Sequence, residues 1–347
     1  MIPLLGSIGR ALGWLFLVTG TAWAFGAVWF DFPIAALRHP AALLILCAAV
    51  AALLFVRPLS RAKLGLLISI LLIAACWFML KPSNNRNWQP DVAETGWAEI
   101  SGDTVTLHNI RNCDYRSESD YTPSWETRNV RLSQLTGLDL AIVYWGSPWI
   151  AHPIATFRFA DEPPLCFSIE TRKETGESYS TVAGFYRQYE LVYIMADERD
   201  VIRLRTNYRE GEDVYLYRTV ATPAQARRRF IEYLNTLNAL RAHPRWYNAL
   251  TTNCTTTIRT QRPANERMPW DWRLLLNGKS DQMLFERHVI ATGGLSFDEL
   301  KRQSRINERA RVANHSPDFS TAIRVGLPSD NPGQRLGMQG PVPSASR

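Results

Sequence analysis

The stretch YNALTTNCTTTI occupies residues 247–258 and places one cysteine between an asparagine and a run of threonines. Asparagine is a preferred N-cap residue, because its side-chain oxygen accepts hydrogen bonds from the free backbone N–H groups at a helix start. The stretch therefore predicts a helix that begins at Cys254 and is capped by Asn253. Because the positive end of the helix dipole stabilises a thiolate in the first turn, Cys254 is a candidate nucleophile. A lone cysteine near a helix start is as often a buried packing residue, so both interpretations stay open here.

The N-terminal part of the chain is much more apolar than the rest. Apolar runs cover residues 11–30, 33–56 and 64–80, and each approaches the ~20 residues that span a hydrocarbon core of ~30 Å. The first run is long, rich in tryptophan and followed at once by two more runs. We therefore expect an uncleaved membrane anchor of three transmembrane helices within residues 1–80, and not a cleavable signal peptide.

Positive charges predict the orientation of this anchor. Arg10 precedes the first run and three basic residues lie within 57–63, whereas Asp31 balances Arg38 in the first loop. Because basic loops stay in the cytoplasm, everything after residue 80 is expected outside it. The predicted location is the bacterial inner membrane, with several passes and with the following domain in the periplasm.

The remainder of the chain predicts an α+β domain. A polar linker over residues 81–96 leads into a domain over 97–327, and a tail over 328–347, rich in Pro, Gly and Ser, is expected to be disordered. Alternating or continuous apolar residues predict strands. These strands are expected at 97–100, 104–110, 127–132, 138–145, 151–159, 165–172, 191–195, 201–205 and 213–218.

Helical patterns occupy the other segments. Thr222 and Gln225 form a capping-box pattern around a proline, which predicts a helix that ends before His243. Further helices are expected in the amphipathic stretches 282–290 and 297–313, and a short one at 179–189.

Five cysteines divide between the two parts of the chain. Cys47 and Cys76 lie in the apolar runs, whereas Cys113, Cys166 and Cys254 lie in the exported part. In an oxidising compartment an odd number leaves at least one thiol unpaired. We expect Cys113 and Cys166 to lie close together and form a disulfide, which leaves Cys254 free.

Charge and spacing limit the classes of ligand. The chain has 39 Lys and Arg against 32 Asp and Glu, a formal net charge of +7, and no nucleic-acid motif, so its expected partner is the anionic membrane surface. Arg203, Arg205 and Arg209 are interpreted as ligands of lipid phosphate or as an exposed strand face. No cysteine–histidine spacing is typical of zinc, and the acidic cluster at 197–200 is more typical of a solvated ion-pair network. Neither a metal nor a cofactor is expected.

Thiol acyl chemistry also requires a base and a group that orients this base. Of the six histidines, His108 and His152 lie on predicted strands. His152 is preferred, because antiparallel pairing of its strand with the next one puts Glu170 on the same face. The alternative is a satisfied core histidine beside a surface glutamate, and a register slip of one residue would turn Glu170 away.

Aromatic residues precede the histidine strand. Tyr144 and Trp145, together with Asn253, are expected to contact the substrate. The alternative is that the aromatic side chains close the core.

Several short motifs occur in a fixed order. They are RNCDYR (111–116), WETR (125–128), YWG (144–146), HP (152–153), SIETR (168–172), RQYEL (187–191), DERD (197–200), YN (247–248) and NCT (253–255).

This series resembles the bacterial Lnb N-terminal periplasmic domain family, which is named after a lipoprotein N-acyltransferase. That family is similar to circularly permuted NlpC-type, papain-like thiol enzymes, in which the histidine strand precedes the cysteine helix. The resemblance implies a permuted papain-like domain with an antiparallel sheet. It also implies that Cys254 is the nucleophile, His152 the general base and acid, and Glu170 the orienting group.

We therefore expect a membrane-anchored, cysteine-dependent acyltransferase with phospholipid and lipoprotein substrates, in which a thioester on Cys254 is the intermediate. Two alternatives remain open: a cysteine amidase or endopeptidase that acts on cell-wall peptides, and a non-catalytic envelope-assembly module in which Cys254 is structural. Nucleic acid is not an expected partner.

Overall fold

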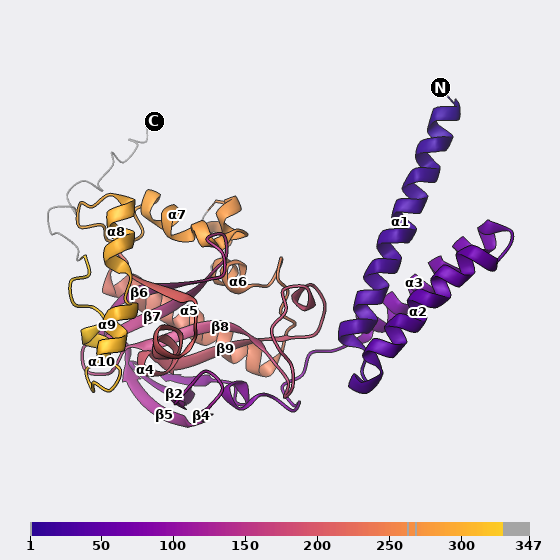
Figure 1. Cartoon of the computed structure of the whole chain (residues 1–347). Coiled ribbons are helices and arrows are strands. Elements are labelled where there is room, and N and C mark those ends of the chain that lie inside the picture. Colours follow the sequence, from indigo (N-terminus) through magenta and orange to yellow (C-terminus); the bar gives the residue numbers. More distant parts are fainter. Residues whose placement is uncertain (1, 262–263, 268, 329–347) are drawn as a thin grey trace, which may run out of the picture. The chain divides into compact units, whose positions relative to one another are not determined.

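The computed structural model of the chain describes residues 2–261, 264–267 and 269–328 (Figure 1). The tail expected to be disordered, 328–347, lies outside these residues apart from Pro328. The described residues fall into two compact units, and each is described by itself.

The first unit contains the apolar helices together with residues 176–190 and 244–251. All three helices are long and apolar enough to cross a membrane. Ala24, Ala49 and Ile70 are buried between them, and the small side chains allow the helices to approach closely. The prediction of three N-terminal apolar helices is confirmed. The helices are α1 (Ile2–Asp31), α2 (Arg38–Phe55) and α3 (Leu59–Met79).

The stretch 179–189 is a loop with one 3-10 turn, Ala183–Phe185, and the prediction of a helix there is wrong. Arg187 Nη1 donates hydrogen bonds to the carbonyl oxygens of Trp77, at 2.7 Å, and Leu80, at 2.9 Å. These contacts hold the segment against the end of α3, so tertiary interactions override its local helical pattern.

The second unit is built on a sheet with the strand order β1-β2-β9-β8-β7-β6-β10, in which β5 also pairs with β2 (Figure 1). Strands β6, β7, β8 and β10 pair antiparallel, whereas β2 and β9 meet in parallel at Arg111 and Ala196. The sheet is therefore predominantly antiparallel. The expectation was a wholly antiparallel sheet, and the parallel contact of β2 with β9 departs from it. The strands are β1 (Trp97–Ser101), β2 (Thr104–Arg111), β5 (Trp125–Arg131), β6 (Leu135–Trp145), β7 (Ala151–Phe159), β8 (Leu165–Arg172), β9 (Glu190–Asp197) and β10 (Glu212–Arg218), with a separate ribbon of β3 (Asp114–Tyr115) and β4 (Tyr121–Thr122).

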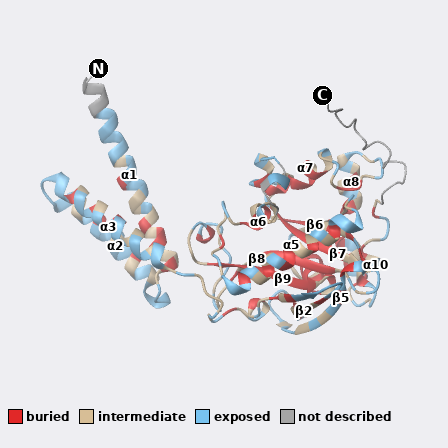
Figure 2. Cartoon of the chain, turned by 180° about the vertical axis from the view of Figure 1, so that it is seen from behind, coloured by how far each residue is buried: buried red, intermediate tan, exposed pale blue. Residues whose placement is uncertain are grey.

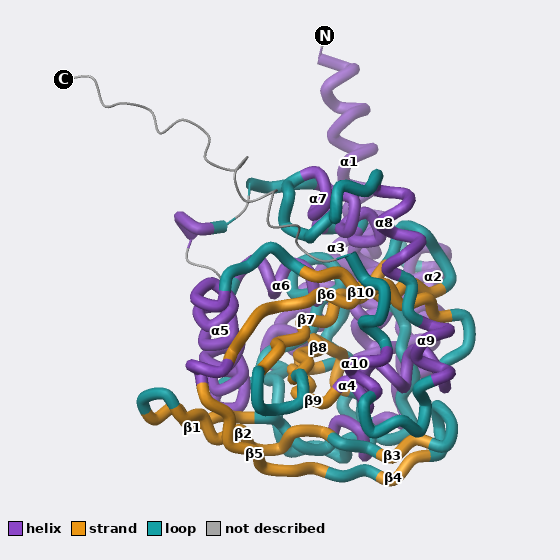
Figure 3. The backbone as a smooth tube through the Cα atoms, turned by 90° about the vertical axis from the view of Figure 1, so that its left-hand side faces the viewer, coloured by secondary structure: helices purple, strands orange, loops and turns teal. Residues whose placement is uncertain are grey.

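Helices cover both faces of this sheet. Figure 3 shows α5 on one side of the central strands and α4, α9 and α10 on the other. Along β7 the side chains alternate between the two faces, because successive residues of a strand point in opposite directions. Ile154 packs with Phe319 of α10, whereas Phe157 packs against Phe230 of α5. The helices of this unit are α4 (Glu198–Arg203), α5 (Pro223–Ala242), α6 (Cys254–Thr260), α7 (Ser280–Glu286), α8 (Phe297–Ser304), α9 (Asn307–Val312) and α10 (Phe319–Ala322).

The central strands are buried on both faces, as Figure 2 shows in red. Strand β7 has only one residue that is not buried, Arg158. A sheet packed on both faces allows only one register, because a slip of one residue would exchange the side chains of its faces. The α+β class expected from the sequence is confirmed.

Two segments of this unit differ from the sequence-based expectation. The stretch 201–205 is not a strand but the end of α4 and the start of a π-helical turn, because Val201 and Ile202 bury their side chains in the core from a helix. The expected helix over 297–313 is interrupted at Ile306, whose N–H donates to the carbonyl oxygen of Val214 at 2.9 Å.

The acidic cluster at 197–200 is not solvated, which corrects the expectation. Glu198 and Asp200 are both 0% exposed. Arg324 Nη2 lies 2.6 Å from Glu198 Oε1, and Arg111 Nη2 lies 2.6 Å from Asp200 Oδ1. Paired and hydrogen-bonded charges of this kind are tolerated in a core, whereas a single one is very costly.

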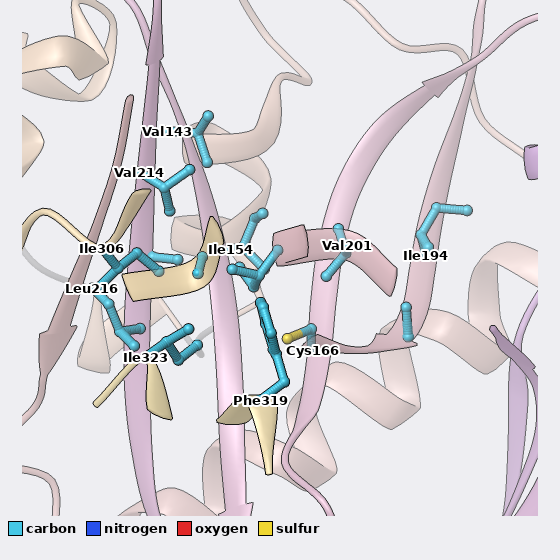
Figure 4. Packing of buried hydrophobic residues seen from close by; sticks show 14 of the residues in the cluster. Val143, Ile154, Cys166, Ile194, Val201, Val214, Leu216, Ile306, Phe319 and Ile323 are labelled. Atoms are coloured by element: carbon cyan, nitrogen blue, oxygen red, sulfur yellow. The ribbon is translucent and has the colours of Figure 1, made fainter. Parts of the chain in front are cut away.

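The expected disulfide between Cys113 and Cys166 is not present, because both are free thiols. Cys113 packs beside Tyr115 in one small cluster. Cys166 lies in the main core with its sulfur near Phe319 (Figure 4) and 3.2 Å from Thr156 Oγ1. The two thiols belong to separate clusters, and a disulfide requires its two Cα atoms to lie within about 7 Å. The prediction is wrong.

We expect Arg324→Ala to lower the free energy of unfolding by about 3–5 kcal/mol, because it leaves the buried carboxylates of Glu198 and Asp139 without their shared cation. Urea denaturation of the full-length protein in detergent measures the change. Arg116→Ala is the control, since the pair of Arg116 with Asp120 is exposed, and no measurable change is expected. Equal effects of the two substitutions would contradict the structural role of the buried cluster.

Candidate active site

Helix α6 begins at Cys254 and is capped by Asn253, as the sequence predicts. Asn253 Oδ1 accepts hydrogen bonds from the N–H groups of Thr255, at 3.0 Å, and Thr256, at 2.9 Å. In return Thr256 Oγ1 accepts from the Asn253 N–H at 3.0 Å. These bonds place the thiol in the first helical turn. They also engage the side chain of Asn253, which was expected to contact the substrate.

The thiol of Cys254 is buried, with 8% of the residue exposed. Its sulfur lies 3.6 Å from Asn277 Nδ2 and 3.8 Å from Thr255 Oγ1. Burial raises the pKa of the Cys254 thiol to about 11. The group is therefore a neutral thiol at pH 7, and not the thiolate expected from the helix dipole, because the loss of hydration outweighs the favourable field of one short helix.

A chain of hydrogen bonds joins His152 to Glu170 across strands β7 and β8. The register pairs Ile154 with Ser168, and its continuation brings His152 opposite Glu170 on the same face. His152 Nε2 lies 2.7 Å from Ser168 Oγ, and Ser168 Oγ donates to Glu170 Oε1 at 2.7 Å. The direct distance from His152 Nε2 to Glu170 Oε1 is 3.8 Å. The structure thus brings the two predicted residues together, with Ser168 between them.

This chain assigns the tautomer of His152. Although burial opposes ionisation, the guanidinium of Arg205 holds the pKa of Glu170 well below its usual range. A carboxylate only accepts hydrogen bonds, so Ser168 donates its single hydroxyl proton to Glu170 and accepts one from His152 Nε2–H. Burial, together with Arg205, lowers the pKa of His152 to about 3. The imidazole is therefore neutral, and its Nδ1 carries the lone pair that can accept a proton.

Arg205 is a buried part of this site, which corrects its interpretation as a lipid ligand or part of an exposed face. Arg203 is buried as well, whereas Arg209 is half-buried. The Arg205 side chain is 5% exposed, and its Nη2 lies 2.7 Å from Glu170 Oε1. Its Nη1 lies 3.3 Å from Glu212 Oε2. Arg205 is thus the cation that keeps Glu170 ionised inside the domain.

Asn277 connects the cysteine helix to the histidine strand. Its Oδ1 accepts a hydrogen bond from the N–H of Ala151, the residue before His152, at 2.8 Å. Its Nδ2 donates to Thr255 Oγ1 at 3.1 Å and lies beside the sulfur of Cys254. No hydrogen bond joins Cys254 directly to His152 in the described part of the chain. Sequence reasoning missed Asn277, because it lies in an irregular segment 23 residues after the cysteine and belongs to no local pattern.

Tyr144 and Trp145 lie at the end of β6. The Tyr144 ring is buried. Its hydroxyl donates a hydrogen bond to the carbonyl oxygen of Gly278 at 3.0 Å and accepts one from Lys301 Nζ at 2.9 Å. Trp145 is half-buried and pairs with Glu212 of β10. The polar end of Tyr144 is therefore occupied by contacts within the domain.

A cavity of about 370 Å³ lies between the sheet and helices α5 to α7. Exposed charged residues, such as Arg228 and Glu266, line its rim. Thr255, the neighbour of Cys254, is one of its polar wall residues, and most of the buried wall is apolar. Pro153 and Ala155 line it from the face of β7 opposite to that of His152, because successive residues of a strand alternate between the two faces. The buried wall residues include Ile142, Pro153, Ala155, Thr255, Leu274 and Met283. Among the described residues no group of three or more His, Cys, Asp or Glu side chains is placed to hold a metal ion.

These features define an α+β domain with a thiol, a neutral imidazole and an apolar cavity. Residues 121–278 match the sequence model of the family described as the Lnb N-terminal periplasmic domain. The resemblance seen in the motifs is confirmed over this segment, which includes His152, Glu170, Cys254 and Asn277. No curated protein and no solved structure matches the chain. Together with the three apolar helices, this match fits a membrane-associated periplasmic domain.

The protonation states predict how the thiol reacts. With a pKa of about 11 for Cys254, we expect the rate constant for its alkylation by iodoacetamide to rise about tenfold per unit between about pH 7 and pH 10, because only the thiolate reacts. Peptide mass spectrometry of the full-length protein measures Cys254 separately from the other cysteines, with N-acetylcysteine as the reference thiol. A plateau that begins below neutral pH would instead indicate a thiolate–imidazolium pair at rest.

Proposed function

We propose that the chain is a cysteine-dependent acyltransferase of the bacterial inner membrane, anchored by several passes. In this proposal it moves an acyl chain from a phospholipid to the amino terminus of a lipoprotein. The observation that carries the proposal is the apolar cavity that reaches Thr255, one residue from the thiol. Cavities of about 300–1,000 Å³ are typical of small-ligand sites, and an apolar wall suits an acyl chain better than a cell-wall peptide.

The first half-reaction forms the thioester. The sulfur of Cys254 attacks the ester carbonyl while His152 Nδ1 takes the thiol proton, and a carbon–sulfur bond forms. The carbon–oxygen bond to glycerol then breaks, and His152 returns the proton to the departing oxygen. Lysophospholipid leaves, and the imidazole is neutral again. Because both groups start uncharged, the proton moves only as the sulfur attacks.

The second half-reaction transfers the chain. The amino group of the lipoprotein attacks the thioester carbonyl, and His152 Nδ1 accepts a proton from the attacking nitrogen. The carbon–sulfur bond breaks as this proton passes to sulfur, which restores the Cys254 thiol. Ser168 and Glu170 hold the imidazole in the required tautomer throughout, and act as positioning residues.

Two donors beside the sulfur suit the negative charge that develops on the carbonyl oxygen. Asn277 Nδ2 lies 3.6 Å from Cys254 Sγ. The Cys254 N–H lies at the start of α6, where the side-chain cap serves the next two N–H groups. In comparable sites the loss of one such donor lowers kcat by about 10²–10³.

The membrane anchor supports a lipid substrate. Donor and acceptor in this proposal both stay in the bilayer, so an anchored enzyme meets them at a high effective concentration. The same argument does not apply to soluble peptide fragments.

We expect full-length protein incubated with defined phospholipids to gain the mass of one acyl chain, and hydroxylamine to remove it, because thioesters react with this nucleophile. Intact mass spectrometry measures the adduct, and Cys254→Ser is the control that lacks the thiol. Absence of an adduct on protein whose thiol is free would contradict the proposed acyltransferase activity. Cleavage of cell-wall peptides would then favour the amidase. Normal function of the Cys254→Ala variant would favour the non-catalytic module.

The cavity makes a separate prediction about chain length. Ala155 is buried on β7 and lines the cavity, so Ala155→Phe shortens the space available. We expect this variant to form the adduct with long-chain donors about tenfold or more slowly than wild type, since a filled pocket excludes the chain. Its reaction with a short-chain donor is expected to be unchanged, which also reports that the variant is folded. Equal slowing for both donors would count against the cavity as the acyl site.

A further inference from the structure

Two loops of the first unit are fastened to the ends of its apolar helices. They comprise residues 176–190 and 244–251. Besides the bonds from Arg187 to the end of α3, the Arg187 N–H donates to Asp31 Oδ2 at 2.9 Å. Asp31 is the last residue of α1, and it also accepts a hydrogen bond from Trp77 Nε1 at 2.6 Å. The first loop therefore bridges the ends of α1 and α3.

Aromatic contacts reinforce this attachment. The ring of Tyr186 lies 5.2 Å from that of Phe30, between centroids, and the guanidinium of Arg187 lies 4.0 Å from the centre of the Trp77 ring. Tyrosine and tryptophan are enriched where a membrane meets water. The loop thus lies beside the ends of α1 and α3, and the ends of membrane-crossing helices are where the bilayer surface meets water.

The second loop binds to the first through its backbone. The N–H of Ala249 donates to the carbonyl oxygen of Gly184 at 2.8 Å, and the N–H of Tyr247 donates to that of Tyr189 at 2.9 Å. Both loops are consequently attached to the same helix ends, the first directly and the second through the first.

Four large side chains of these loops are exposed although they are apolar or aromatic. Their exposed fractions are 45% for Tyr179, 56% for Val182, 42% for Phe185 and 55% for Leu250. We call these four residues the interfacial patch. Apolar side chains beside the ends of membrane-crossing helices have the bilayer as their nearest apolar environment, because such helices are surrounded by hydrocarbon.

We propose that the interfacial patch inserts into the outer leaflet of the membrane. The partner is the lipid surface itself, and the contact is independent of whether the thiol is catalytic. Burial of these side chains among lipid removes apolar area from water, and the attachments at Asp31 and Arg187 pre-order the loops, so little entropy is lost on insertion.

Insertion also constrains the thiol. Leu250 precedes Cys254 by four residues, and an extended chain spans at most about 3.6 Å per residue, so their Cα atoms lie within about 14 Å of each other. An inserted Leu250 therefore keeps Cys254 close to the lipid headgroups. This consequence rests on the proposed function, because only a lipid substrate makes the closeness useful.

Photocrosslinking tests the insertion without any need for activity. The full-length protein carries p-benzoylphenylalanine in place of Leu250 or Val182 and is placed in nanodiscs of phosphatidylethanolamine and phosphatidylglycerol. After irradiation, we expect intact mass spectrometry to show protein plus one phospholipid. The matched control replaces Val312, a 91% exposed valine of the second unit, and is expected to give no lipid adduct. Absence of adducts at both patch positions, or equal adducts at Val312, would overturn the proposal.

A second measurement separates the surface from the chemistry. We expect Val182→Asp combined with Leu250→Asp to slow acylation of Cys254 by bilayer phospholipid about tenfold or more, through lost effective concentration. Acylation of the double variant by a short-chain, water-soluble ester is expected to be unchanged. The control variant Val312→Asp is expected to react at the wild-type rate with both the lipid donor and the soluble donor. Slowing with the soluble ester as well would contradict a role confined to the membrane surface. If the wild-type protein is never acylated, the proposed function is contradicted. The crosslinks would still decide whether the interfacial patch inserts into the membrane.

Discussion

The register of β7 against β8 is the constraint on which the rest of the site depends. Pairing of Ile154 with Ser168 puts His152, Ser168 and Glu170 on one face, and a shift of one residue would separate them. Both faces of these strands are packed, and β7 also pairs with β6, where His152 lies opposite Val143. The hydrophobic core therefore sets the geometry of the polar residues, and not the reverse.

The low polarity of the domain interior then determines which groups of the site are ionised. The buried Arg205 lies 2.7 Å from Glu170 and keeps it ionised, while burial keeps His152 and Cys254 uncharged. The site therefore contains one ion pair, between Arg205 and Glu170, together with an uncharged thiol and an uncharged imidazole. In the proposed acyl transfer the imidazole and thiol acquire charge only in the presence of the substrate carbonyl, where Asn277 Nδ2 can stabilise the carbonyl oxygen. A fixed donor in a dry site is effective because it does not reorganise.

The membrane part of the chain contributes more than attachment. Arg187 and Asp31 join loops of distant sequence to the helix ends, and the second of these loops runs directly into the capped start of α6. The proposed insertion and the proposed chemistry are thus linked by a few residues of backbone. In the proposed acyl transfer, this short connection limits the distance between the thiol and its lipid substrate.

Features with a local cause were determined by the sequence alone. Periodicity predicted the apolar helices and the strands around His152 and Glu170, and Asn253 predicted where α6 begins, because propensity and capping act over a few residues. Tertiary structure decided the rest. It buried Arg205, inserted Ser168 into the hydrogen-bond chain, brought Asn277 to the sulfur, separated the cysteines expected to pair and turned 201–205 into helix. These outcomes depend on packing between segments far apart in sequence, which compensates buried charges and overrides local preference.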